Sequence, residues 1–212
     1  MMRILYLHGF ASGPQSKKAS FFKDQLAREG LTLATPDLTD GNFRDLTLTG
    51  QLQVLEREAA GQSVFLIGSS MGGYLAALYA ARHPEVAGLV LLAPAFSFYR
   101  RWTEMMDPES LARWRREGQM MIHHYGENRE MALGYQLMED AEKYEPYPSF
   151  SQPCLIVHGT GDTAVPIEYS KGFARRHPNV KMVRLQSGHE LTDVLGDIWA
   201  EAWPHLLRVI TR

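Results

Sequence analysis

A serine nucleophile is predicted where a glycine-rich turn joins a short apolar segment to a helix. Gly68-Ser69-Ser70-Met71-Gly72 fits the pattern G-x-S-x-G, follows the apolar run Val64–Ile67 and precedes a segment of helical composition. In such a strand–turn–helix arrangement, the sharp turn projects the central hydroxyl above the sheet edge. Gly68 and Gly72 have no Cβ to clash with this turn. Ser70 is therefore the candidate nucleophile, and the alternative is an ordinary Gly-Ser turn between strand and helix.

A serine hydroxyl needs a base to accept its proton, and histidine suits this role near neutral pH. Among eight histidines, His189 stands apart because Ser187-Gly188-His189-Glu190 falls between the last predicted strand and the final helix. That loop lies at the carboxyl edge of a sheet and could reach Ser70. The other histidines have structural interpretations: bracing the first loop (His8), helix ends before proline (His83 and His177), a strand end (His158) and the surface (His123, His124 and His205).

The third member of such a constellation is a carboxylate that orients the histidine. Asp162 ends His158-Gly159-Thr160-Gly161-Asp162, a glycine-rich loop directly after an apolar strand. It lies 92 residues after Ser70 and 27 before His189, which is the nucleophile–acid–base order of one class of serine hydrolases. Its carboxylate would fix the imidazole tautomer and stabilise the imidazolium. Singly, Asp162 could be a capping residue and His189 an ordinary loop residue; Asp193 is a rival acid.

Two backbone N–H groups are candidates for binding a developing oxyanion. One is the N–H of Met71, directly after the nucleophile. The other is the N–H of Phe10, in the loop after the first predicted strand, where Gly9 permits close approach of the backbone. His8 is expected to brace this loop rather than to act in the chemistry.

The elements that must position these residues alternate between short strands and helices. Near-continuous apolar strands are typical of a parallel sheet covered by helices on both faces. The predicted strands are Arg3–Leu7, Leu31–Thr35, Ser63–Ile67, Ala87–Leu92, Cys154–His158 and Lys181–Leu185. The predicted helices are Ser16–Glu29, Leu48–Ala60, Met71–Arg82, Pro166–Arg176 and Glu190–Trp203, the last followed by Pro204 and a short tail helix.

One segment, residues 95–150, interrupts the alternation and is called the insertion below. It contains no convincing strand, six of the ten methionines and ten of the 22 aromatic residues. A structureless loop of that length is uncommon, which predicts a helical insertion. Met and aromatic side chains suit an adaptable apolar surface, although a helical subdomain with its own core would have the same composition. The candidate pocket residues are Trp102, Met105, Met120 and Tyr125.

Composition excludes several other classes of protein. The chain has 212 residues, 45% of them hydrophobic and 22% charged, with a net charge of −2, which favours one globular domain over residues 1–212 and disfavours a nucleic-acid partner. No apolar run approaches the roughly 20 residues of a membrane span, nor is a signal-peptide core present. Cys154 is the single cysteine, and no recognised metal-ligand pattern occurs. We expect a cytoplasmic protein without a metal or cofactor.

These motifs resemble those of α/β-hydrolase-fold serine hydrolases over nearly the whole chain. The opening Leu7–Lys17, together with the Ser70 and Asp162 motifs, is similar to small bacterial YqiA/YcfP-like esterases. The resemblance implies a triad of Ser70, Asp162 and His189 and an insertion that caps the site. It also implies a mostly parallel sheet of about six strands in the order 2-1-3-4-5-6, without the two-strand hairpin that usually begins the fold.

The expected function is hydrolysis of short- to medium-chain acyl esters through an acyl-enzyme. The alternatives are an acyl-CoA or protein thioesterase with the same triad, a peptidase or acyltransferase, and a non-catalytic ligand-binding protein on the same fold. A dehalogenase is disfavoured because it would carry Asp in place of Ser70.

Overall fold

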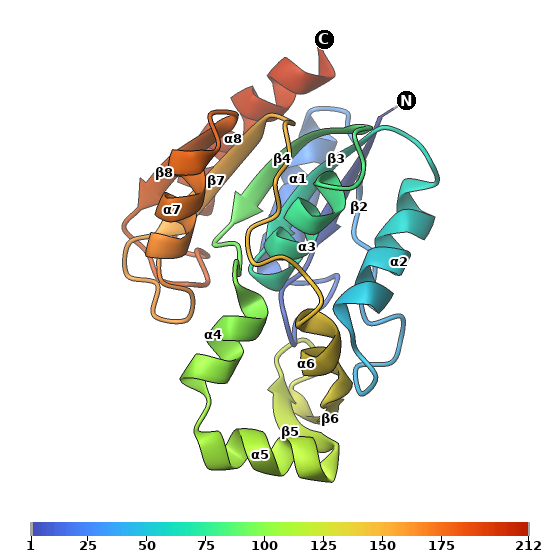
Figure 1. Cartoon of the computed structure of the whole chain (residues 1–212). Helices are drawn as coiled ribbons and strands as arrows, with labels where there is room; N and C mark the ends of the chain where they lie inside the picture. Colours follow the sequence, from blue (N-terminus) through green and yellow to red (C-terminus); the bar gives the residue numbers. More distant parts are fainter. Residues whose placement is uncertain (1, 212) are drawn as a thin grey trace.

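A parallel six-stranded sheet forms the centre of the protein in the computed structural model, which describes residues 2–211 (Figure 1). Its order is β2-β1-β3-β4-β7-β8, and every neighbouring pair is parallel. Counted along the sheet-forming strands alone, this is the expected order 2-1-3-4-5-6. The strands are β1 (Arg3–Leu7), β2 (Leu33–Ala34), β3 (Val64–Ser69), β4 (Val86–Leu92), β7 (Cys154–Gly159) and β8 (Val180–Leu185).

Helices cover both faces of this sheet, as the continuous apolar strands indicated. Along β1, Ile4 and Tyr6 pack into a core with α1 (Lys17–Arg28) and α8 (Leu195–Ile210). Leu5 and Leu7 point to the opposite face and join a larger core. Because alternate strand residues face opposite sides, both sides of the central strands must be apolar. The larger core includes residues of α2 (Leu48–Ala59), α3 (Met71–Ala80) and α7 (Glu168–Arg176).

The last helix continues through a proline, contrary to the sequence prediction. We expected a helix to end at Trp203 and a second one to follow Pro204, but α8 runs from Leu195 to Ile210 with Pro204 inside. Proline removes one intrahelical hydrogen bond and crowds the preceding turn, whereas the helix buries apolar side chains on both sides of it (Ile198, Ala202 and Leu206). Packing against the sheet therefore outweighs the local cost. At 16 residues α8 is the longest described helix, and within residues 2–211 no helix is long and apolar enough to cross a bilayer.

Two histidines that we expected at the surface are buried. His205, on α8, is 7% exposed and packs edge-on against Phe65 at 6.0 Å between ring centroids. His124 is 5% exposed and meets Phe43 at 4.7 Å. Both burials depend on residues far away in the sequence, so a local pattern could not indicate them. His123, which alternates with His124 along a strand, is exposed as expected.

The insertion is only partly helical, which corrects the expectation of a helical cap without strands. Its elements are α4 (Phe98–Met105), α5 (Pro108–Glu117), β5 (Gln119–His124), β6 (Arg129–Gly134) and α6 (Gln136–Ala141). The strands form an antiparallel hairpin in which Met120 pairs with Leu133 and Ile122 with Met131. Alternate residues of β5 face inward, but Met120, Met121 and Ile122 are consecutive apolar residues, so no two-residue period in the sequence marked the strand.

The insertion lies beyond the carboxyl ends of the sheet strands (Figure 1). Trp114 of α5 is 1% exposed and donates its indole N–H to Leu133 O at 3.0 Å, which ties α5 to the hairpin. The hairpin turn reaches the loop after β1, where Tyr125 N–H donates to Ala11 O at 2.8 Å. The insertion therefore packs on the edge of the sheet at which the candidate catalytic residues emerge.

Candidate active site

Ser70 occupies a strained turn between β3 and α3. Its backbone has φ 54° and ψ −115°, a region that costs free energy for any residue with a side chain. A Cβ at Gly72 would lie 2.2 Å from Leu7 O, and one at Gly68 would lie 2.4 Å from Gly72 O. Side chains are thus sterically excluded at both glycines. Because glycine has no side chain, α3 can begin directly against β1 and β3, with Ser70 at the carboxyl edge of the sheet.

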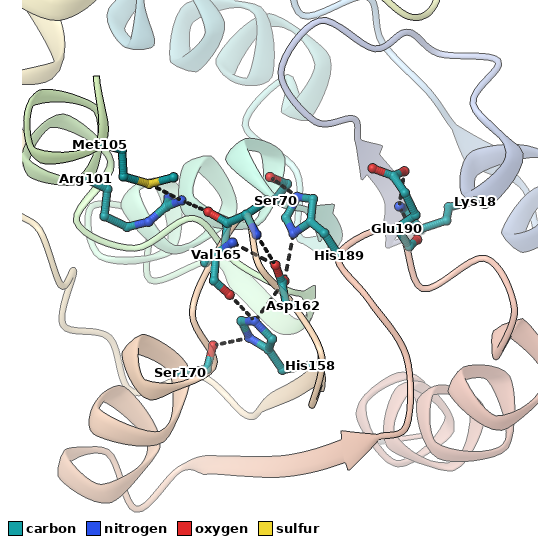
Figure 2. Close-up of polar contacts among 11 residues, drawn as sticks. Lys18, Ser70, Arg101, Met105, His158, Asp162, Val165, Ser170, His189 and Glu190 are labelled. Carbon is teal, nitrogen blue, oxygen red and sulfur yellow. Dashed lines mark hydrogen bonds and ion pairs between the residues drawn. The ribbon is translucent and has the colours of Figure 1, made fainter. Parts of the chain in front are cut away.

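His189 lies in the loop after β8 and reaches the nucleophile. Ser70 Oγ–H can donate to His189 Nε2, at an Oγ–Nε2 distance of 3.0 Å. His189 Nδ1–H donates to Asp162 Oδ2 at 2.7 Å. The structure thereby brings together all three residues of the predicted constellation, drawn from loops after three different strands (Figure 2).

The Asp162 carboxylate is buried and fully engaged. Its Oδ1 accepts hydrogen bonds from the N–H groups of Ala164, at 2.9 Å, and Val165, at 2.7 Å. Burial by itself would raise the pKa of Asp162, but hydrogen bonds from His158, His189 and Val165 outweigh it and hold the pKa well below its ordinary value. The carboxylate is therefore a fixed negative charge beneath His189.

His158 is a member of this network that the sequence analysis missed. The side chain is 0% exposed, and its Nε2 lies 2.9 Å from Val165 O and 3.1 Å from Asp162 Oδ2. Both neighbours are acceptors, so Nε2 must carry a proton. Nδ1 lies 2.8 Å from Ser170 Oγ. His158 was interpreted as a strand end; its position four residues before Asp162 on one tight loop was the available signal.

The loop after β1 lies against the nucleophile turn. A Cβ at Gly9 would be 3.4 Å from both Ser69 O and Ser70 Cβ. His8 Nδ1–H donates to Gly9 O at 3.0 Å, and Leu38 N–H donates to His8 Nε2 at 3.2 Å. Both ring nitrogens thus hold backbone groups, the bracing arrangement predicted for His8, and burial lowers its pKa.

The two candidate oxyanion donors border the same space. Met71 is the first residue of α3, where an N–H has no intrahelical acceptor. Phe10 and Met71 both line the cavity beside Ser70. A substrate oxygen in that cavity could therefore face the amino-terminal end of α3.

The cavity has a volume of about 860 Å³ and includes Ser70 and His189 in its wall. Its apolar lining includes residues of α4 and of the hairpin turn, among them three predicted pocket residues, Trp102, Met105 and Tyr125. The exposed fractions of Met105 and Tyr125 are 63% and 77%, which places both at the rim. The fourth prediction, Met120, was wrong: this side chain does not border the cavity and packs against the larger core, because β5 turns it inward.

Two buried cations hold the loops that carry His189 and Asp162, and neither was singled out from the sequence. Lys18 Nζ–H donates to Glu190 O, next to His189, at 2.6 Å. Arg101 Nη2–H donates to Ala164 O, two residues after Asp162. Figure 2 shows Lys18 and Arg101 approaching the triad from opposite sides. No sequence pattern indicated their burial, because Lys18 on α1 and Arg101 on the insertion each contact a carbonyl that is distant in the sequence.

A family comparison identifies the relatives of this chain. The model of the uncharacterised protein family UPF0227 matches residues 3–202. The chain belongs to this family. The match spans the sheet, the insertion and every triad residue.

Solved structures place this UPF0227 member among α/β hydrolases by fold. Est1E from Butyrivibrio proteoclasticus, solved with ferulic acid bound, matches with a TM-score of 0.84 and 21% identity, over 100% of this chain and 90% of Est1E. Mouse alpha/beta hydrolase domain-containing protein 10 matches with a TM-score of 0.77 and 22% identity, over 93% of this chain and 85% of its own. The α/β hydrolase GrgF from Penicillium sp. sh18 matches with a TM-score of 0.78 and 14% identity, over 100% of this chain and 91% of GrgF.

Proposed function

We propose that the protein is a serine hydrolase that cleaves carboxylic esters with short- to medium-chain acyl groups. The observation that carries this proposal is the continuous hydrogen-bonded chain from Ser70 through His189 to Asp162 at the wall of the cavity. Nucleophile, base and orienting carboxylate are each within hydrogen-bond reach of the next, the geometric requirement for this chemistry.

The first half-reaction forms an acyl-enzyme. Ser70 Oγ attacks the ester carbonyl while its proton passes to His189 Nε2. Asp162 holds the proton on Nδ1, so that Nε2 is free to accept, and its charge stabilises the resulting imidazolium. The carbonyl oxygen becomes an oxyanion, for which the N–H groups of Met71 and Phe10 are the proposed donors. When the C–O bond breaks, the departing alkoxide takes the proton from Nε2 and leaves as the alcohol.

The second half-reaction consumes one water molecule. His189 Nε2 accepts a proton from water as the water oxygen attacks the acyl carbonyl. Collapse of the second tetrahedral intermediate returns that proton to Ser70 Oγ and releases the carboxylic acid. The enzyme is regenerated with neutral His189, and the net reaction is ester plus water to acid plus alcohol.

The cavity offers an apolar surface on which an acyl chain can be buried. Its walls are apolar where α4 contributes Phe98 and Trp102, and each buried methylene there stabilises a bound substrate by about 0.8 kcal/mol. Est1E, which shares the fold, was solved with ferulic acid bound, so an aromatic acyl group belongs among the substrates to test.

The test is a hydrolysis panel with the wild type and Ser70→Ala. The panel contains p-nitrophenyl esters from acetyl to decanoyl, a feruloyl ester and matched acyl-CoA thioesters. Ser70→Ala should lower kcat by about 10⁶ while the circular dichroism spectrum stays unchanged. A fluorophosphonate should label the wild type at Ser70 only.

The panel also distinguishes the remaining candidates. A higher kcat/KM for the thioester of the same acid would replace the esterase assignment by a thioesterase. A folded Ser70→Ala variant that keeps more than a few per cent of activity would refute Ser70 as nucleophile.

A further inference from the structure

Arg101 is a buried guanidinium in the wall of the substrate cavity. It lies on α4, is 6% exposed and shares the cavity wall with Ser70 and His189. Its side chain extends from α4 toward the loop that carries Asp162 (Figure 2). The cavity that would accept an ester therefore has a positive charge on the side formed by α4, beside the apolar lining residues Phe98, Trp102 and Met105.

Within residues 2–211, few hydrogen-bond acceptors contact this guanidinium. Nη2–H donates to Ala164 O and lies 3.9 Å from Met105 Sδ, a weak acceptor. Nε is buried without a hydrogen-bond partner. The guanidinium carbon lies 5.7 Å from the ring centre of Tyr169, within the range of a cation–π contact. No described carboxylate forms an ion pair with Arg101, and a guanidinium has five N–H donors to satisfy.

The other buried cation of the cavity provides a contrast. Lys18 has a carboxylate partner, because its Nζ lies 3.6 Å from Glu190 Oε2. Among the described residues, Arg101 contacts one carbonyl, one sulfur that is a weak acceptor, and one aromatic ring. Burial lowers the pKa of Arg101, with Tyr169 and Asp162 acting in the opposite direction. An uncompensated buried charge is costly, and proteins compensate such charges with a partner.

We propose that Arg101 binds a carboxylate on the substrate, so that the preferred substrates are anionic esters in which a carboxylate lies a few bonds from the scissile carbonyl. This inference rests on the proposed esterase function and specifies its substrate class. A carboxylate accepts two N–H bonds from a guanidinium and would supply the missing counter-charge. The fixed contact to Ala164 O holds the guanidinium at the cavity wall, so little side-chain entropy is lost on binding.

The experiment measures charge preference as a ratio within each variant. One arm places the carboxylate in the acyl part and compares the p-nitrophenyl monoester of adipic acid with p-nitrophenyl heptanoate, of similar length. The second arm places it in the alcohol part and compares 4-acetoxybenzoate with neutral 4-acetoxybenzamide. Ratios of kcat/KM cancel any loss of folded protein. The wild type should prefer the anionic ester in one arm, and the arm that responds locates the carboxylate.

Arg101→Met should reduce that preference by about 10- to 100-fold, the range expected when one charge-assisted hydrogen-bonded pair is lost. Arg101→Lys should retain part of it. The matched control is Arg100→Met on the same helix, since Arg100 is exposed and pairs with Glu104 at the surface. This control changes the net charge equally and should leave the ratio within about twofold, because exposed charges are screened.

If Arg101 acts only as a clamp on Ala164, Arg101→Met will slow the anionic and the neutral ester alike and the ratio will not move, which overturns the proposal. Equal rates for both esters in the wild type would also overturn it. Calorimetric titration of adipate into Ser70→Ala, with and without Arg101→Met, tests carboxylate binding without any turnover. Arg101-dependent binding of adipate by a protein that hydrolyses no ester would support the carboxylate site and refute the esterase function.

Discussion

Asp162 is the residue on which the most contacts of the site converge. Two backbone N–H groups hold its Oδ1, while His189 Nδ1 and His158 Nε2 approach its Oδ2. The carboxylate can therefore neither rotate nor shift without losing several bonds at once. An orienting residue needs this rigidity, because a small misplacement of the base costs a large factor in rate.

The Asp162→Asn substitution should lower kcat by about 10⁴, because an amide can donate to Nδ1 and so favour the wrong imidazole tautomer. Esterase assays on p-nitrophenyl butyrate measure this effect. The matched control is Asp193→Asn: Asp193 is exposed and accepts a hydrogen bond from Ser187. It should keep activity within about twofold, and the reverse pattern would transfer the orienting role to Asp193.

At the scale of elements, the site is built from loops that distant segments hold in place. Lys18 of α1 contacts the loop that carries His189, and Arg101 of α4 in the insertion contacts the loop that carries Asp162. The hairpin turn in addition bonds to the loop after β1. The insertion and α1 are thus parts of the site's framework as well as its walls.

Lys18→Met should lower kcat by roughly 10- to 100-fold with little change in KM, because the loop that carries His189 loses its anchor while the acyl pocket remains intact. Lys18→Arg, which keeps a donor, should restore part of the rate. Lys23→Met, an exposed lysine of the same helix, is the control. An increase in KM without loss of kcat would instead make Lys18 a substrate-binding residue.

The cavity wall predicts the chain-length profile. Trp102→Ala should shift the optimum acyl chain to greater length while acetyl-ester turnover stays within about tenfold, since a wall residue contributes binding rather than chemistry. Met105→Ala and Tyr125→Ala, at the rim, should have smaller effects. Met120→Ala is the control because Met120 faces the core. The measurement is kcat/KM for esters from acetyl to decanoyl. If all variants kept the wild-type chain-length profile, the insertion would not determine acyl-chain specificity.

At the scale of the whole molecule, the buried Asp162 charge links stability to pH. Its pKa is lowered in the folded protein, so the unfolded chain binds a proton first as the pH falls. The stabilisation is then complete above the unfolded value of about 3.9 and is lost progressively as the pH falls toward the folded value. Acid should therefore weaken the fold through this one group.

The free energy of unfolding should differ most between wild type and Asp162→Asn near pH 7, and the difference should shrink as the pH is lowered from about 5 to 3. Urea unfolding at fixed pH values measures this difference. A difference in unfolding free energy that stays constant or grows as the pH falls would contradict the assignment of a lowered pKa to Asp162.

Much of this architecture could be predicted from the sequence because its signals are local. Most of the sheet strands are contiguous apolar runs, and Ser70, Asp162 and His189 each lie in the turn or loop after a strand. Carboxyl ends of parallel strands share one edge, so the topology alone brings the three loops together. The order of the sheet followed from the family resemblance, and the fold of the sheet agrees with it.

Tertiary structure alone decided the remaining features, and each depends on residues distant in the sequence. The β5–β6 hairpin exists because its alternate side chains find a core to cover, whereas its composition gave no clear period. Pro204 stays within α8 because apolar residues on both sides of it are buried. His158, Lys18 and Arg101 acquire their roles from partners that fold next to them, and burial by a distant segment leaves no mark on the local pattern of a chain.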